Sequence, residues 1–95
     1  MSRSSAERSI EEQCYRPDLV LMMPARWGLG FMLASKDLPL SPNPRTFGHG
    51  GAGGSLAIAD LDAGVSWGYV MNKMAGGTTG DARAGSIAAA FYGCL

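Results

Sequence analysis

The stretch Thr46-Phe47-Gly48-His49-Gly50-Gly51-Ala52-Gly53-Gly54-Ser55 is the most informative part of this 95-residue chain. Half of its residues are glycine, and it carries the only histidine. Glycine has no Cβ, so such a backbone lets a ligand come close and can point its N–H groups at developing negative charge. An imidazole beside this backbone suggests acyl chemistry, whereas by spacing alone an ordinary loop histidine is the favoured interpretation, because one imidazole without a nucleophile specifies no reaction.

Two strands are predicted directly after this stretch. Alternating bulky side chains predict strands over residues 55–60 and 65–72, and the short connection between them is typical of a β-hairpin. Asp60 and Asp62 are interpreted as turn residues of this hairpin. Neither strand has a clearly polar face, so we expect both sides of the hairpin to be covered.

A third strand is predicted upstream, over residues 26–33, where Trp27 and Phe31 share one face. Three prolines indicate an irregular loop over residues 34–46. The large aromatic side chains could line an acyl pocket, but alternating strand positions favour the core for Phe31 and Trp67.

Two helices complete the pattern. Ser4 and Glu7 fit a capping box for an N-terminal helix over residues 4–14. Asp81 fits the N-terminus of a helix over residues 81–93, and it is expected to form a surface ion pair with Arg83. The apolar stripe of this second helix comprises Ala84, Ile87, Ala88, Phe91 and Leu95. The predicted class is therefore α+β, an antiparallel sheet of about three strands with helical cover.

Composition excludes several function classes. The chain has eight basic and eight acidic residues and a net charge of zero, whereas nucleic-acid or acidic-membrane partners require a basic surplus. No apolar run is long enough to span a membrane. Cys14 and Cys94 have no metal-ligand spacing, so we expect no metal and no cofactor, and reduced thiols favour a cytoplasmic protein. Gly48, Gly50 and Gly53 satisfy G-x-G-x-x-G, but a strand follows them where a dinucleotide site needs a helix.

Three segments together resemble the C-terminal end of the β-lactamase-related serine hydrolases, which include class C β-lactamases, penicillin-binding proteins and β-lactamase-like esterases. The most specific is FGHGGAGGSLAIADLDAGVSWGYVMNKM, residues 47–74. The others run from Leu19-Val20-Leu21 through Arg26-Trp27-Gly28-Leu29-Gly30-Phe31, and from Gly80-Asp81-Ala82-Arg83 to Leu95. The resemblance covers roughly residues 18–95, so residues 1–95 are interpreted as one partial domain, a partial β-lactamase-like α/β domain, with residues 1–17 as a candidate leader outside the family.

The resemblance implies roles for the glycine-rich stretch. In this family a Ser-x-x-Lys motif carries the nucleophile and a Tyr-x-Asn motif assists it, while a Lys-Thr-Gly or His-x-Gly motif lies on the strand that borders the cleft. Here His49-Gly50-Gly51 matches the third motif, so these residues would contact substrate. By the same match, the backbone N–H of Ala52 would be the second oxyanion donor.

The first two motifs are absent. The residues three places before the only lysines, Lys36 and Lys73, are Leu33 and Val70, and no tyrosine is followed two residues later by asparagine. We therefore assign no catalytic residue. The chain is expected to be the C-terminal fragment of a serine hydrolase acting on esters or amides, inactive alone. A non-catalytic interaction module that needs a complementing chain or self-associates, or a gene remnant, is the alternative.

Overall fold

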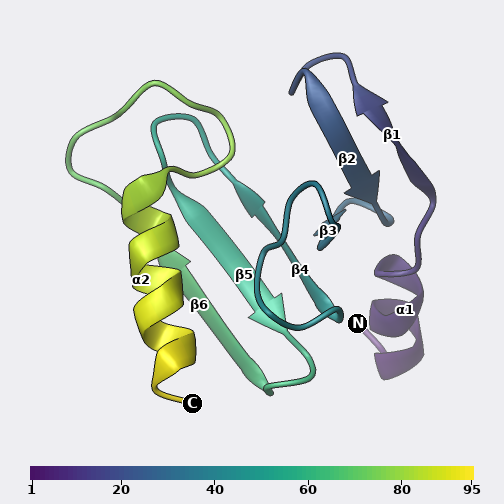
Figure 1. Ribbon diagram of the computed structural model, residues 1–95. Coiled ribbons are helices and arrows are strands. Elements are labelled where there is room, and N and C mark those ends of the chain that lie inside the picture. Colours follow the sequence, from purple (N-terminus) through teal and green to yellow (C-terminus); the bar gives the residue numbers. More distant parts are fainter.

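The computed structural model describes residues 1–95 and shows an α+β fold with a six-stranded antiparallel sheet and two helices (Figure 1). Each strand pairs with the next one along the chain, so the sheet is a meander. The predicted class is confirmed, whereas the prediction of about three strands is wrong. The elements are α1 (Arg3–Ser9), β1 (Cys14–Asp18), β2 (Met23–Trp27), β3 (Met32–Leu33), β4 (Thr46–Gly50), β5 (Leu56–Asp60), β6 (Val65–Tyr69) and α2 (Ala82–Gly93).

The predicted strand 26–33 is two strands joined by a turn. The N–H of Gly28 donates to the carbonyl of Phe31 (2.8 Å), and this bond reverses the chain between β2 and β3. Glycines inside a strand pattern often mark such a bend. β1 escaped prediction because it contains Pro17, which is tolerated at the edge of the sheet, opposite Pro24 of β2.

β4 also escaped prediction as a strand because its sequence, Thr-Phe-Gly-His-Gly, has few side chains that could show alternation. It pairs along its whole length with β5. The hairpin of β5 and β6 is confirmed, although β6 ends at Tyr69, before the predicted residue 72.

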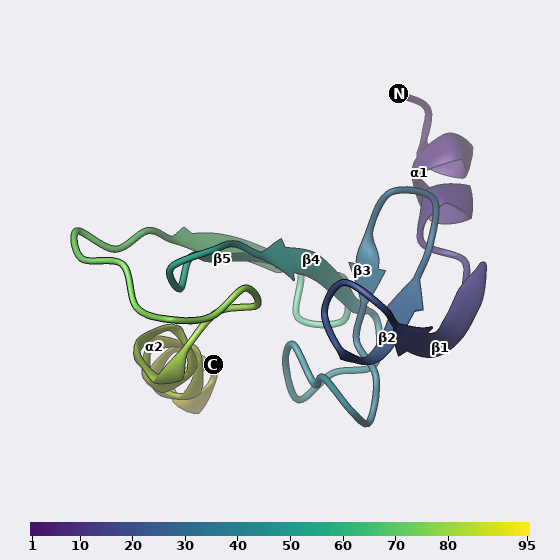
Figure 2. The same cartoon turned by 90° about the horizontal axis from the view of Figure 1, so that it is seen from above.

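The two faces of the β4–β6 sheet differ. Helix α2 and the 34–45 loop lie on the same side of it (Figure 2). The core is there, formed by Ala34, Leu40 and Ile58 with Trp67 packed against them. The expectation that both faces are covered is therefore wrong, because Ala57 on the opposite face is exposed. We call that opposite face, which carries Phe47, His49, Ala57 and Ala59 in register, the open face.

The helices follow the predictions in part. α1 is capped by Ser2, whose hydroxyl accepts from the N–H of Ser5 (3.2 Å), so the capping box expected at Ser4 and the extent to residue 14 are wrong. α2 matches the prediction, with Asp81 as its cap. Ile87 and Leu95 of its predicted stripe are exposed. Neither helix has the length and apolarity needed to cross a membrane.

Candidate functional site

The predicted site residues His49 and Gly50 lie where β4 extends beyond its neighbour β3. β3 pairs with β4 only through Phe47 and Gly48, whereas β5 pairs with all five residues of β4. Backbone polar groups alternate in direction along a strand. Since the carbonyl of Thr46 points at β3 and accepts from Ala34 (2.9 Å), the polar groups of Gly50 point to the same side, where β3 has ended. This end of β4 is a free strand edge.

The imidazole of His49 is held beside this free edge. The indole ring of Trp27 lies against it, with ring centroids 5.6 Å apart and planes inclined by 33°. Its Nδ1 contacts the carbonyl oxygen of Gly50. Nε2 has no hydrogen-bond partner in the chain, and the residue is exposed. The contact with Trp27 was not predicted, because 22 positions separate the two residues and no local pattern links them.

The chain continues into a turn of residues 51–54, which we call the glycine-rich turn. The N–H of Gly51 donates to Ser55 (2.8 Å), and that of Gly54 to Gly51 (3.2 Å). Gly53 and Gly54 have φ values of +90° and +118°, which side chains rarely adopt. The N–H of Ala52, exposed in the middle of this turn, donates to no group of the chain. Of the predicted residues 49–52, His49 and Ala52 are exposed, Gly51 is half-buried and Gly50 is buried.

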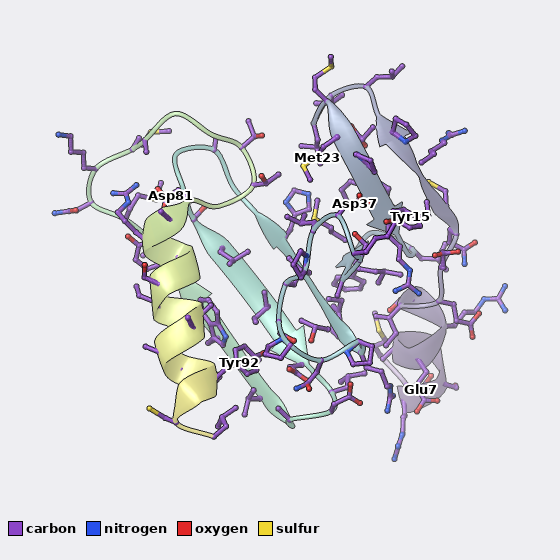
Figure 3. All side chains as sticks on the ribbon, in the orientation of Figure 1. Glu7, Tyr15, Met23, Asp37, Asp81 and Tyr92 are labelled. Carbon is purple, nitrogen blue, oxygen red and sulfur yellow. The ribbon has the colours of Figure 1, made fainter.

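Arg83 holds the glycine-rich turn in place. Its guanidinium donates to the carbonyl of Gly53 (3.1 Å) and to that of Lys73 (2.8 Å), which joins the turn to the loop after β6. The same group donates to Asp81 (2.6 Å), and this bond lowers the pKa of the Asp81 carboxyl. Figure 3 labels Asp81 at the start of α2. The cap and the ion pair were predicted, but the bonds from Arg83 to the loops were not.

An apolar hollow of about 390 Å³ opens beside His49. Phe31, predicted to lie in the core, is half-buried at this hollow and stacks edge-on against Phe47, with ring centroids 5.0 Å apart. Trp67, in contrast, packs against the core as predicted. The remaining lining comes from the open face and its backbone: Gly30, Gly48, His49, Ala57, Ile58 and Ala59.

A second polar cluster lies on the covered face, around Asp60. This carboxylate is 1 % exposed. It accepts hydrogen bonds from the side chains of Ser41 (3.1 Å), Asn43 (2.8 Å) and Tyr92 (2.8 Å), and from the N–H groups of two turn residues, Asp62 (3.0 Å) and Ala63 (2.9 Å). Burial by itself would raise the pKa of Asp60, but these bonds outweigh it and lower the pKa to about 2.

The cluster joins the 34–45 loop, the β5–β6 turn and α2. Figure 3 shows Tyr92 pointing from α2 toward that loop. The prediction that Asp60 is a turn residue is correct, but its long-range partners were missed, because they lie 17 to 32 positions away.

The residues around His49 offer hydrogen-bonding groups, but they include no serine or other nucleophile paired with a general base. A free strand edge, an unpaired N–H at Ala52 and an imidazole can orient a carbonyl group and stabilise charge on its oxygen. No group of three or more histidine, cysteine or carboxylate side chains could hold a metal ion. The candidate site therefore offers hydrogen-bonding groups beside an apolar hollow.

Comparison with known proteins identifies the family. The β-lactamase family model matches residues 1–91. Two solved structures match the whole chain: a family VIII carboxylesterase, with 38% identity and a TM-score of 0.91, and a penicillin-binding protein homologue from Caulobacter crescentus, with 37% identity and a TM-score of 0.92. The chain spans 26% of the length of each. No curated protein matches it. The chain belongs to the β-lactamase family, as its sequence motifs indicated.

Proposed function

We propose that this chain is the C-terminal quarter of a β-lactamase-like serine hydrolase and supplies one wall of its acyl site. His49, Gly50 and Gly51 would align the substrate, and the N–H of Ala52 would donate to the oxyanion. The observation that carries this proposal is the unpaired N–H of Ala52, an exposed residue three positions after the exposed His49. The two free cysteines, Cys14 and Cys94, are consistent with action in the cytoplasm.

The proposed reaction is the hydrolysis of carboxylic esters. One of the two matching structures is described as a carboxylesterase, and the histidine form of the third motif agrees with that chemistry. The serine that attacks the carbonyl would come from residues outside this sequence, because the chain has no Ser-x-x-Lys motif. A missing oxyanion donor typically lowers a rate by about 10²–10³, whereas a missing nucleophile removes covalent catalysis. The chain alone is therefore expected to be inactive.

The open face favours a second candidate function, an interaction module. Phe31, Phe47, Ala57 and Ala59 form an apolar hollow there. Small alanine side chains let another element approach the sheet closely. Because the chain spans 26% of its structural relatives, the remaining part of a family domain is the partner that this face would fit. This candidate needs no catalytic activity.

A chimera tests the first candidate. The segment of the family VIII carboxylesterase that matches this chain is replaced by residues 1–95, and hydrolysis of a p-nitrophenyl ester is measured. We expect activity and trapping by a serine-directed phosphonate. In the chimera, Ala52→Pro removes the N–H and is expected to lower kcat by about 10²–10³, with an unchanged melting temperature as the control for folding. An Ala52→Pro chimera that is folded and retains its kcat would contradict the oxyanion role.

The isolated chain provides the complementary test. Residues 1–95 and the His49→Ala variant are expected to hydrolyse the ester equally slowly and to form no phosphonate adduct. Faster hydrolysis by the unmodified chain, together with an adduct, would contradict the assignment of the nucleophile to another segment. Size-exclusion chromatography addresses the second candidate: binding to the remaining part of a family domain without any hydrolysis would favour an interaction module.

A further inference from the structure

The contacts of His49 fix which of its two ring nitrogens carries a proton. Nδ1 contacts the carbonyl oxygen of Gly50, and a carbonyl oxygen can only accept, so Nδ1 must donate. A neutral imidazole has one N–H, which leaves a lone pair on Nε2. Turning the ring over would place a carbon atom against the carbonyl and lose this bond. The contact therefore sets the orientation of the ring and its tautomer together.

Trp27 limits the movement of this ring. Its indole lies 5.6 Å from the imidazole, centroid to centroid. The backbone that carries this indole is held on both sides, because Trp27 is paired with Cys14 of β1 and with Met32 of β3. Its carbonyl also accepts from the N–H of Gln13 (2.7 Å). The imidazole thus lies between a tilted indole ring and the Gly50 carbonyl of its own strand, and these two contacts reduce the rotamer freedom that is left to lose on binding.

We propose that His49 acts as a hydrogen-bond acceptor through Nε2 and that this selects acyl groups carrying a hydroxyl donor near the ester carbonyl. This rests on the proposed function. A carboxylate at the same place would set its acceptor oxygens against the lone pair of Nε2, with no proton between them. The site therefore favours hydroxyacyl esters over esters of dicarboxylic acids. Trp27 is a positioning residue, since it acts through the histidine.

The acceptor role is tested first without any enzymatic activity. The chain has one histidine, so the imidazole nitrogens of the ¹⁵N-labelled chain give unambiguous NMR signals. At about pH 8 we expect the Nδ1–H tautomer. Trp27→Leu is expected to remove the ring-current shift of the imidazole protons and to mix the tautomers. Trp67→Phe is the matched control, because it changes the second tryptophan of the chain, which packs on the covered face. It should alter neither the ring-current shift nor the tautomer of His49.

Predominance of the Nε2–H tautomer in the unmodified chain would overturn the acceptor role, whether or not the Trp27 variant folds. A Trp27→Leu variant that is folded and has unchanged imidazole signals would overturn the positioning role.

Substrate selection is then measured in the active chimera. The p-nitrophenyl esters of 3-hydroxybutyrate and succinate are compared, with butyrate as the reference. We expect kcat/KM for the hydroxyacyl ester to exceed that for butyrate by about tenfold, the value of one neutral hydrogen bond, and succinate to be the poorest substrate. His49→Lys places a cationic donor at the site and should reverse the order of hydroxybutyrate and succinate. Equal kcat/KM for the three esters, or a preference for succinate, would overturn the proposed selection. An inactive chimera would count against the proposed function, while the NMR result would still decide the acceptor role.

Discussion

Asp60→Asn is expected to destabilise the fold in a pH-dependent way. The substitution keeps the shape of the side chain and removes its charge. The new amide group would face three side-chain donors, those of Ser41, Asn43 and Tyr92, without an acceptor for them. The two turn N–H groups would keep an oxygen partner. The variant therefore isolates the charge and three of the five hydrogen bonds.

The pKa of Asp60 gives the magnitude. It falls from its ordinary value of 3.8 to about 2, and each pKa unit corresponds to about 1.4 kcal/mol. The folded state thus favours the carboxylate by about 2.5 kcal/mol. Because the folded pKa lies below the unfolded one, this stabilisation is fully present above about pH 4 and is lost as the pH falls through about 2. Asp18 and Asp81, whose pKa values are also lowered, are shared by both proteins and cancel in the difference.

Urea unfolding of the 95-residue chain, followed by circular dichroism between about pH 6 and pH 2, measures this difference. We expect Asp60→Asn to lower the free energy of unfolding by about 2.5 kcal/mol at pH 6, and the gap to the unmodified chain to shrink between about pH 4 and pH 2. Asp62→Asn is the matched control. Asp62 accepts one backbone bond, from Arg45 (3.1 Å), which an amide oxygen can keep. The substitution therefore removes only the exposed ion pair with the Arg45 guanidinium (4.0 Å), and it is expected to cost at most about 1 kcal/mol. A gap that does not vary with pH, or equal effects of the two substitutions at pH 6, would refute the reasoning.

Three further predictions concern other contacts. Gly54→Ala would place a Cβ at 2.3 Å from a carboxylate oxygen, in a backbone with φ +118°. At Gly64 φ is +67° and the space is open, so Gly54→Ala should lower the melting temperature more than Gly64→Ala. Equal decreases in the melting temperature would contradict the steric argument. Tyr92→Phe removes one charge-assisted bond to Asp60 and should lower the unfolding free energy by about 1.5–3 kcal/mol in urea, with no change counting against the bond. Arg83→Lys keeps the charge but cannot make the same set of hydrogen bonds. The amide hydrogens of the glycine-rich turn should therefore exchange with solvent faster than in the unmodified chain, while those of β5 stay protected. Unchanged exchange in the turn would show that other contacts hold it.

A helix or strand could be predicted from the sequence where a single local feature, such as side-chain periodicity or a helix cap, dominated its segment. The β5–β6 hairpin and α2 were predicted because side-chain periodicity and the Asp81 cap are each visible within a few residues. β1 and β4 were missed because Pro17 and the glycines around His49 are unfavourable for strands in isolation. There, pairing with neighbouring strands overrides local preference.

Residues 49–52 could be proposed as a candidate site from the sequence because they are contiguous and match a single motif. Their support was not predictable. Trp27 and Arg83 reach the site across 22 and 30 positions, and the free edge exists because β3 stops after two residues. Such contacts depend on how the sheet bends and where its strands end, which no local periodicity encodes.

Helix α2 both holds the glycine-rich turn of the candidate site and takes part in the polar cluster around Asp60 that stabilises the fold. Its first turn carries Arg83, which holds the glycine-rich turn, and its last turn carries Tyr92, which is bound to Asp60. Both anchors lie within this chain, whereas the open face beside His49 does not contribute to either. The position of residues 51–54 therefore depends on the docking of α2 and is independent of whatever covers the open face. This separation explains how a chain that spans 26% of its structural relatives can hold the glycine-rich turn in place with contacts of its own.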